Sequence, residues 1–64
     1  MHGVRLLRNE SELTQHALAE KSGVSRATIA RMEGDKDYSP SADTLKKLAA
    51  ALGCTIDELV KSDT

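Results

Sequence analysis

The chain has 64 residues, of which 39% are hydrophobic and 30% are charged, and its formal net charge at pH 7 is -1. A chain of this length has material for one small core, so we expect a single domain over residues 1–64. Its one cysteine, Cys54, excludes an internal disulfide. No apolar run is long enough for a membrane span or a signal peptide. We therefore expect a soluble, cytoplasmic protein without contact to a membrane.

The charges are distributed unevenly along the chain. Residues 1–31 contain five Lys and Arg against three Asp and Glu, whereas residues 32–64 contain four against seven. Net charge governs non-specific affinity for nucleic acid, while the placement of charge decides which face can meet phosphate groups. The chain is therefore polarised, and its positive half is N-terminal.

Two short helices are expected at the beginning of the chain. The first covers about residues 3–9 and presents Val4 and Leu7 on one face. The second opens after Thr14, a residue type that favours helix N-caps, and stops at Gly23. A third helix then starts only three residues later, because Ser25 is again of the N-cap type. This spacing predicts a tight helix-turn-helix over about residues 14–34.

Two further helices are expected after a loop around Ser39 and Pro40. The fourth has the clearest amphipathic pattern and ends at Gly53, with apolar residues at Leu45, Leu48, Ala49 and Leu52. The segment from Thr55 to Glu58 has the form of a capping box. It predicts a last helix over about 56–61, with Ile56 and Leu59 turned inward. Strand signals are poor, so the predicted fold class is all-α with five short helices.

The third helix divides into two faces of different chemistry. At 100 degrees per residue, one side carries Thr28, Ile29, Met32 and Glu33, and the other carries Arg26, Ala27, Ala30, Arg31 and Gly34. Small residues beside two arginines allow the helix to approach a surface closely. A DNA major groove about 12 Å wide admits one α-helix, and Arg can donate two hydrogen bonds to guanine. On an isolated helix, such arginines would more often be a solvated face; within a helix-turn-helix they favour DNA contact.

The segment TQHALAEKSGVSRATIARMEGDK, residues 14–36, resembles the helix-turn-helix of the XRE family, the Cro and phage-repressor type. The following segment, SPSADTLKKLAAALGCTIDEL, is similar to the last two helices of that family. The resemblance implies a lambda-repressor-like DNA-binding fold with the helix-turn-helix at its second and third helices. It also implies a sequence-specific transcriptional regulator, by default a repressor, that binds a double-stranded DNA operator and needs no cofactor.

The resemblance also implies roles for individual residues. Gln15 would bind a phosphate at the N-terminus of the second helix, helped by backbone N–H groups. The base-reading and neighbouring positions of the third helix are Ser25, Arg26, Ala27, Ala30 and Arg31. Arg8 and Glu33 would form a partly buried structural ion pair, although two unrelated surface charges are the alternative.

The chain departs from the family pattern after Glu33. The glycine, Gly34, comes one position early, and two carboxylates, Asp35 and Asp37, flank Lys36. Lys36 is still expected to contact the DNA backbone. Acidic groups beside phosphate are repulsive, so we expect modest affinity with a strong dependence on salt.

Other residue combinations argue against catalysis and metal binding. His2, His16 and Cys54 lie on separate predicted elements without metal-ligand spacing, so no metal and no enzymatic activity are expected. One short helix offers few contacts, which favours a homodimer that places two recognition helices about 34 Å apart. Val60 on the last helix is a candidate for the interface. The alternative function is a protein-interaction module, such as an antitoxin or an anti-repressor.

Overall fold

The structure, a computed structural model, describes residues 2–35 and 37–61. Its elements are α1 (His2–Glu10), α2 (Gln15–Ser22), α3 (Arg26–Gly34), α4 (Ala42–Leu52) and α5 (Ile56–Lys61). Within this described part of the chain there are five helices and no strands. The predicted all-α fold class is confirmed, and the helix boundaries agree with the predicted ones to within about a turn.

The helix-turn-helix segment is defined by side-chain and glycine caps. The Thr14 hydroxyl accepts a hydrogen bond from the Ala17 backbone at 3.0 Å, and the α2 helix ends at Gly23 with φ of 78°. The hydroxyl of Ser25 accepts from the Thr28 backbone at 3.1 Å and so begins α3. These caps satisfy N–H groups that have no partner within the helix. They are the caps that the sequence predicts.

The two C-terminal helices are capped in the same way. Ser41, which the sequence analysis did not single out, accepts a hydrogen bond from the Thr44 backbone and begins α4, and Gly53 ends it with φ of 72°. At α5, the Thr55 backbone N–H donates to the Glu58 carboxylate at 3.2 Å. The Glu58 N–H donates to the Thr55 hydroxyl at 3.1 Å. This reciprocal pair is the predicted capping box.

The hydrophobic core receives side chains from all five helices and from the turn between α2 and α3. Its buried residues are aliphatic or Met, namely Val4, Leu18, Val24, Ile29, Met32, Leu48, Ala49, Ala51 and Leu59. Partly buried side chains pack around it, including Tyr38, Leu45 and Cys54. The described helices are each too short or too polar to cross a lipid bilayer.

The prediction that Ile56 turns inward is wrong. Leu59 is fully buried, but Ile56 is 37% exposed and Val60 is 45% exposed. On a helix, Ile56 lies about 60° around the axis from Leu59, on the side of Val60. A six-residue helix that buries Leu59 therefore leaves Ile56 at the rim of the core.

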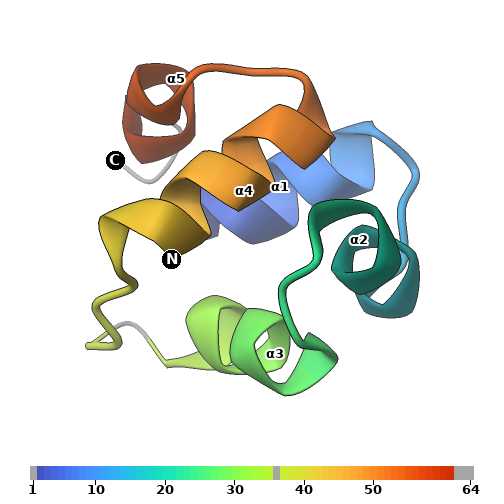
Figure 1. The fold of residues 1–64 in the computed structure, drawn as a ribbon, viewed down its shortest axis with the longest axis horizontal. Coiled ribbons are helices and arrows are strands. Elements are labelled where there is room, and N and C mark those ends of the chain that lie inside the picture. Colours follow the sequence, from blue (N-terminus) through green and yellow to red (C-terminus); the bar gives the residue numbers. More distant parts are fainter. Residues whose placement is uncertain (1, 36, 62–64) are drawn as a thin grey trace.

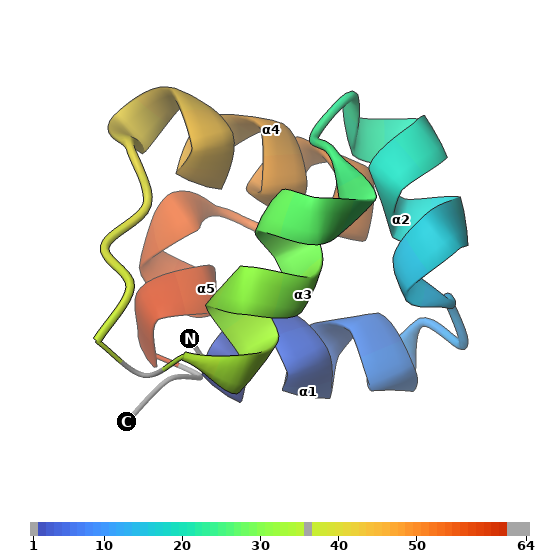
Figure 2. The same cartoon turned by 90° about the horizontal axis from the view of Figure 1, so that it is seen from below.

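The arrangement leaves one side of α3 uncovered. In Figure 1, α1 and α4 lie in the middle of the molecule, with α3 below them and α5 above. Figure 2 views the same molecule from the side of α3, which lies in front with α1 and α4 on either side of it and α2 at the right. The helix that the sequence marks for DNA contact is thus on the molecular surface, away from α5.

Candidate nucleic-acid interface

The turn between α2 and α3 is only three residues long, and each residue has a structural role. Gly23 adopts a left-handed backbone conformation that a side chain would strain. Val24 is buried in the core and anchors the turn. Ser25 then caps α3. This construction fixes the direction of α3 relative to α2, as a helix-turn-helix requires.

The two faces of α3 differ in burial as the sequence predicts. Ile29 and Met32 are fully buried against the core, and Thr28 and Glu33 beside them are partly buried. The opposite face is exposed along its whole length and consists of Arg26, Ala27, Ala30, Arg31 and Gly34. The only long side chains on this exposed face are the two arginines. Its shape and charge therefore suit an anionic groove into which a helix can be inserted.

The predicted residues Ser25 and Arg26 stand at the N-terminal end of this face. The Ser25 hydroxyl donates to the Thr28 hydroxyl at 2.8 Å while it accepts from the Thr28 backbone. Its one donor and one of its two acceptor sites are thus already used within the cap. Arg26 is exposed and forms no ion pair with the residues that the structure describes. The Arg26 guanidinium therefore has its donors available for a ligand.

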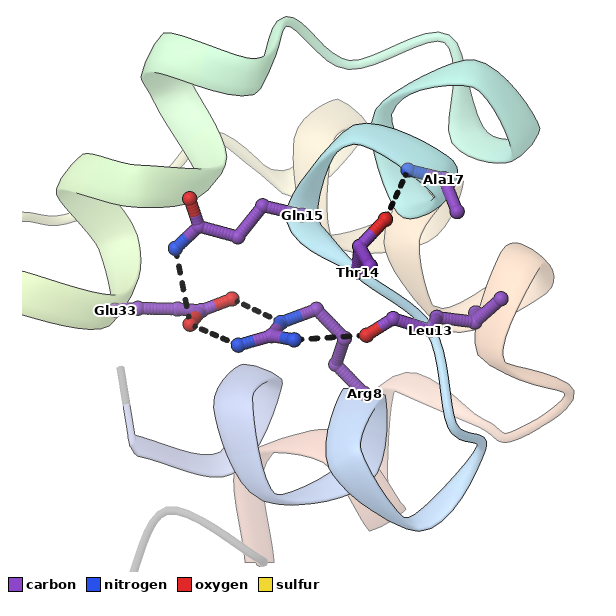
Figure 3. Close-up of polar contacts among 6 residues, drawn as sticks. All are labelled: Arg8, Leu13, Thr14, Gln15, Ala17 and Glu33. Carbon is purple, nitrogen blue, oxygen red and sulfur yellow. Dashed lines mark hydrogen bonds and ion pairs between the residues drawn. The ribbon is translucent and has the colours of Figure 1, made fainter.

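Arg8 and Glu33 join α1 to α3, as Figure 3 shows. Arg8 donates to the two carboxylate oxygens of Glu33, from Nε at 2.7 Å and from Nη2 at 2.8 Å. A third hydrogen bond runs from Arg8 Nη1 to the backbone oxygen of Leu13 at 2.7 Å. The side chains are only 13% and 5% exposed. The geometry is the two-pronged arrangement in which Arg and carboxylate bind most strongly.

The protonation of this pair follows from its surroundings. Burial raises the pKa of Glu33, but the hydrogen bonds from Arg8 and Gln15 and the positive charges of Arg8 and Arg5 outweigh it, so that the pKa lies below its ordinary value. The hydrogen bond to Glu33 raises the pKa of Arg8. Both groups therefore remain charged over the physiological range of pH.

Gln15 is part of the same network. Its side-chain Nε2 donates to Glu33 Oε1 at 3.3 Å, which ties the first residue of α2 to α3 (Figure 3). The family resemblance predicts that Gln15 binds a phosphate, and it gives no sign of this contact with Glu33. A carboxamide nitrogen has two N–H groups, so one remains for a second acceptor.

Arg31 has partners that the sequence analysis missed. Its Nε lies 3.9 Å from the carboxylate of Asp35, and its guanidinium lies 4.8 Å from the ring centre of Tyr38. The i,i+4 spacing of Arg31 and Asp35 is a signal that could have found the first contact. Tyr38 lies beyond the helix end, so its contact depends on the path of the loop.

The other residues predicted or considered for DNA contact are Ala27, Ala30, Lys36 and His16. Lys36 lies outside the described residues. Ala27 and Ala30 are exposed on the outer face of α3. His16 is exposed and lies 3.1 Å from Glu20.

Of the residues considered for catalysis or metal binding, His16 lies on α2 and Cys54 lies between α4 and α5. Cys54 is a free cysteine and is partly buried. Burial and the negative charge of Glu58 raise the pKa of the Cys54 thiol, which disfavours the nucleophilic thiolate. The side chain of His2 lies outside the description. Among the described residues, no three His, Cys, Asp or Glu side chains are placed to hold a metal ion.

The three-residue turn, the buried inner face of α3 and its exposed basic outer face define a helix-turn-helix protein. In agreement, residues 4–59 match a family model described as Helix-turn-helix. The chain belongs to this helix-turn-helix family. The resemblance to the Cro and phage-repressor type is thereby confirmed.

Several curated proteins are similar to the chain. It is 41% identical over 61 residues to the immunity repressor protein of Bacillus phage phi105, covering 95% of this chain and 42% of that protein. It is 51% identical over 49 residues to the HTH-type transcriptional repressor RghR of Bacillus subtilis, covering 77% and 36%. It is 40% identical over 57 residues to the HTH-type transcriptional activator BcrR of Enterococcus faecalis, covering 89% and 28%. The chain thus spans less than half the length of these relatives. No solved structure matches it significantly.

Proposed function

We propose that the chain is a sequence-specific DNA-binding unit that represses transcription, with α3 inserted in the major groove. The observation that carries the proposal is the outer face of α3, on which Arg26 and Arg31 stand among small residues. Repression is favoured because the phage phi105 and RghR relatives are named repressors. A bound domain is sufficient to exclude polymerase, so repression requires no further contact surface.

In this proposal, the N-terminal part of α3 contacts the DNA bases. Arg26 has free donors and can donate two hydrogen bonds to the O6 and N7 atoms of a guanine. Ala27 can contact a thymine methyl group, and Ala30 leaves room for the groove wall. Ser25 contributes through the cap that orients this end of the helix.

In this proposal, residues that precede and follow α3 in the sequence bind DNA phosphates. Gln15 has one N–H group beyond its hydrogen bond to Glu33, and it stands at the N-terminus of α2, where backbone N–H groups favour an anion. Lys36, two positions after the last residue of α3 in the sequence, adds a positive charge. Contacts of this kind fix the register of a protein on the duplex but carry no sequence information.

The homodimer is also a proposal. One short helix reads few base pairs, and two copies related by a two-fold axis would read two half-sites one turn of DNA apart. The α5 helix lies on the far side of α1 and α4 from α3 (Figure 1), and its exposed apolar residues Ile56 and Val60 favour a contact there. A Val60→Lys variant should sediment as a monomer at a concentration at which the wild type is a dimer.

Selection of bound duplexes from a random DNA pool at moderate salt tests the function directly. We expect one enriched motif, and for a dimer two inverted halves separated by about 10 base pairs. Absence of enrichment would contradict the proposal and would favour the protein-interaction module. Co-purification with a partner protein is the observation that would then be expected.

A further inference from the structure

The guanidinium of Arg31 is held at the C-terminal end of α3. The Arg31 Nε lies 3.9 Å from the carboxylate of Asp35, four residues later, which is a spacing at which side chains on a helix meet. Its guanidinium also lies 4.8 Å from the ring centre of Tyr38, which is beyond the end of the helix.

The loop that provides these two partners is itself fixed by hydrogen bonds. The Asp35 backbone N–H donates to the Arg31 carbonyl at 2.8 Å, and the Tyr38 N–H donates to the Asp35 carbonyl at 3.1 Å. The Asp35 side chain accepts from the Asp37 backbone at 3.0 Å. Tyr38 is partly buried and packs against the core. These contacts fix the position of the Tyr38 ring on which the Arg31 guanidinium stacks.

Arg26 provides the contrast on the same face. It stands at the first position of α3 and has no ion pair within the described part of the chain. Arg31 comes five positions later, which corresponds to about 7.5 Å along the helix axis. Because the Arg31 side chain is drawn further towards the helix end, the two guanidinium groups are directed to different parts of the surface.

We propose that Arg31 binds a DNA phosphate at the edge of the groove and not a base, that Tyr38 holds its guanidinium ready, and that Asp35 weakens the contact. This inference rests on the proposed DNA binding. A guanidinium stacked on a ring keeps the N–H groups at its edge available for an anion. The Asp35 carboxylate competes with phosphate for the same donors and repels it at close range.

The first test compares Arg31→Ala with Arg26→Ala. Both variants are measured on the selected duplex and on a duplex of unrelated sequence, over a range of salt concentrations. Arg31→Ala should weaken both complexes by a similar factor and reduce the slope of log affinity against log salt by about one. Arg26→Ala should instead remove the preference for the selected duplex. If Arg31→Ala removes the preference for one base pair and leaves the slope unchanged, Arg31 reads a base and the inference is wrong.

The second test concerns the two positioning residues. Asp35→Asn keeps the oxygen that accepts from Asp37 but removes the charge, so it should tighten binding to both duplexes. Tyr38→Leu should weaken binding about two- to fivefold, the range expected for an exposed cation–π contact, and leave the salt slope unchanged. Tyr38→Phe keeps the ring and should bind as the wild type does. This variant controls for the hydroxyl group, and melting curves show whether each variant is folded and whether Tyr38→Leu loses core packing.

The outcomes separate the two proposals. Wild-type affinity in Tyr38→Leu, or unchanged or weaker binding in Asp35→Asn, would overturn the roles of these residues and leave DNA binding by α3 intact. If the wild type shows no preference for any duplex, the proposed function fails and the inference fails with it.

Discussion

Arg8 and Glu33 lie 25 residues apart in the sequence, and their side chains meet through two hydrogen bonds of 2.7 and 2.8 Å. The contact joins α1, which lies outside the helix-turn-helix, to the last turn of α3. The position and orientation of α3, the proposed recognition helix, therefore depend on the Arg8–Glu33 ion pair as well as on the apolar core.

Removal of one member of this pair should be strongly destabilising. Glu33→Ala leaves the Arg8 guanidinium buried without its partner, which costs about 3 kcal/mol or more. In a domain of this size, that corresponds to a decrease in melting temperature of roughly 10 °C or more. Thermal melting followed by circular dichroism measures it. Glu20→Ala, which breaks the exposed pair with His16, is the control and should cost less than about 1 kcal/mol.

A double variant tests whether the loss comes from the stranded charge. Arg8→Met with Glu33→Leu removes both charges and fills a similar volume, so its stability should return towards that of the wild type. A melting temperature for Glu33→Ala within a degree or so of the wild type would rule out a strong buried pair.

The stability of the domain should depend on pH through Glu33. The pKa of this carboxyl is lower in the folded protein than in the unfolded chain. The stabilisation is therefore complete above the unfolded pKa, and it is lost as the pH falls from about 4 through the folded pKa. Denaturant unfolding at pH 7 and at about pH 3 should show a smaller decrease for Glu33→Gln than for the wild type. Equal decreases would contradict the assignment.

Two glycines should respond in opposite directions to the same substitution. Gly23 has φ of 78°, so Gly23→Ala forces a side chain into the left-handed region at a cost of about 1 kcal/mol or more. Gly34 is helical, and a Cβ there meets no atom within 4 Å. Gly34→Ala should therefore stabilise the protein by about 0.5–1 kcal/mol. The melting temperatures of the two variants measure both effects. A Gly23→Ala variant that melts above the wild type would contradict the left-handed conformation of the turn.

The helices were predictable because their signals are local. Each cap, such as Thr14 or Ser25, acts on a backbone group three residues away, and the glycine stops act through their own φ. The burial of Ile29 and Met32 follows from helical periodicity alone. The pairing of Arg8 with Glu33 is not local, and only the family resemblance suggested it.

The contacts that prediction missed depend on tertiary geometry. The ring of Tyr38 reaches Arg31 because the loop after α3 folds back through hydrogen bonds to Asp35. The exposure of Ile56 depends on where the short α5 helix meets the core. Residue spacing specifies neither this contact nor this exposure, so neither could be predicted from the periodicity of the sequence.

The central claim is that the outer face of α3 reads a DNA sequence. Its most direct test is the affinity of wild type and Arg26→Ala for the duplex selected by the wild type and for a duplex of unrelated sequence. We predict that the variant retains its helical circular dichroism and binds both duplexes with similar, weak affinity. An Arg26→Ala variant that still prefers the selected duplex by the wild-type factor would contradict the claim.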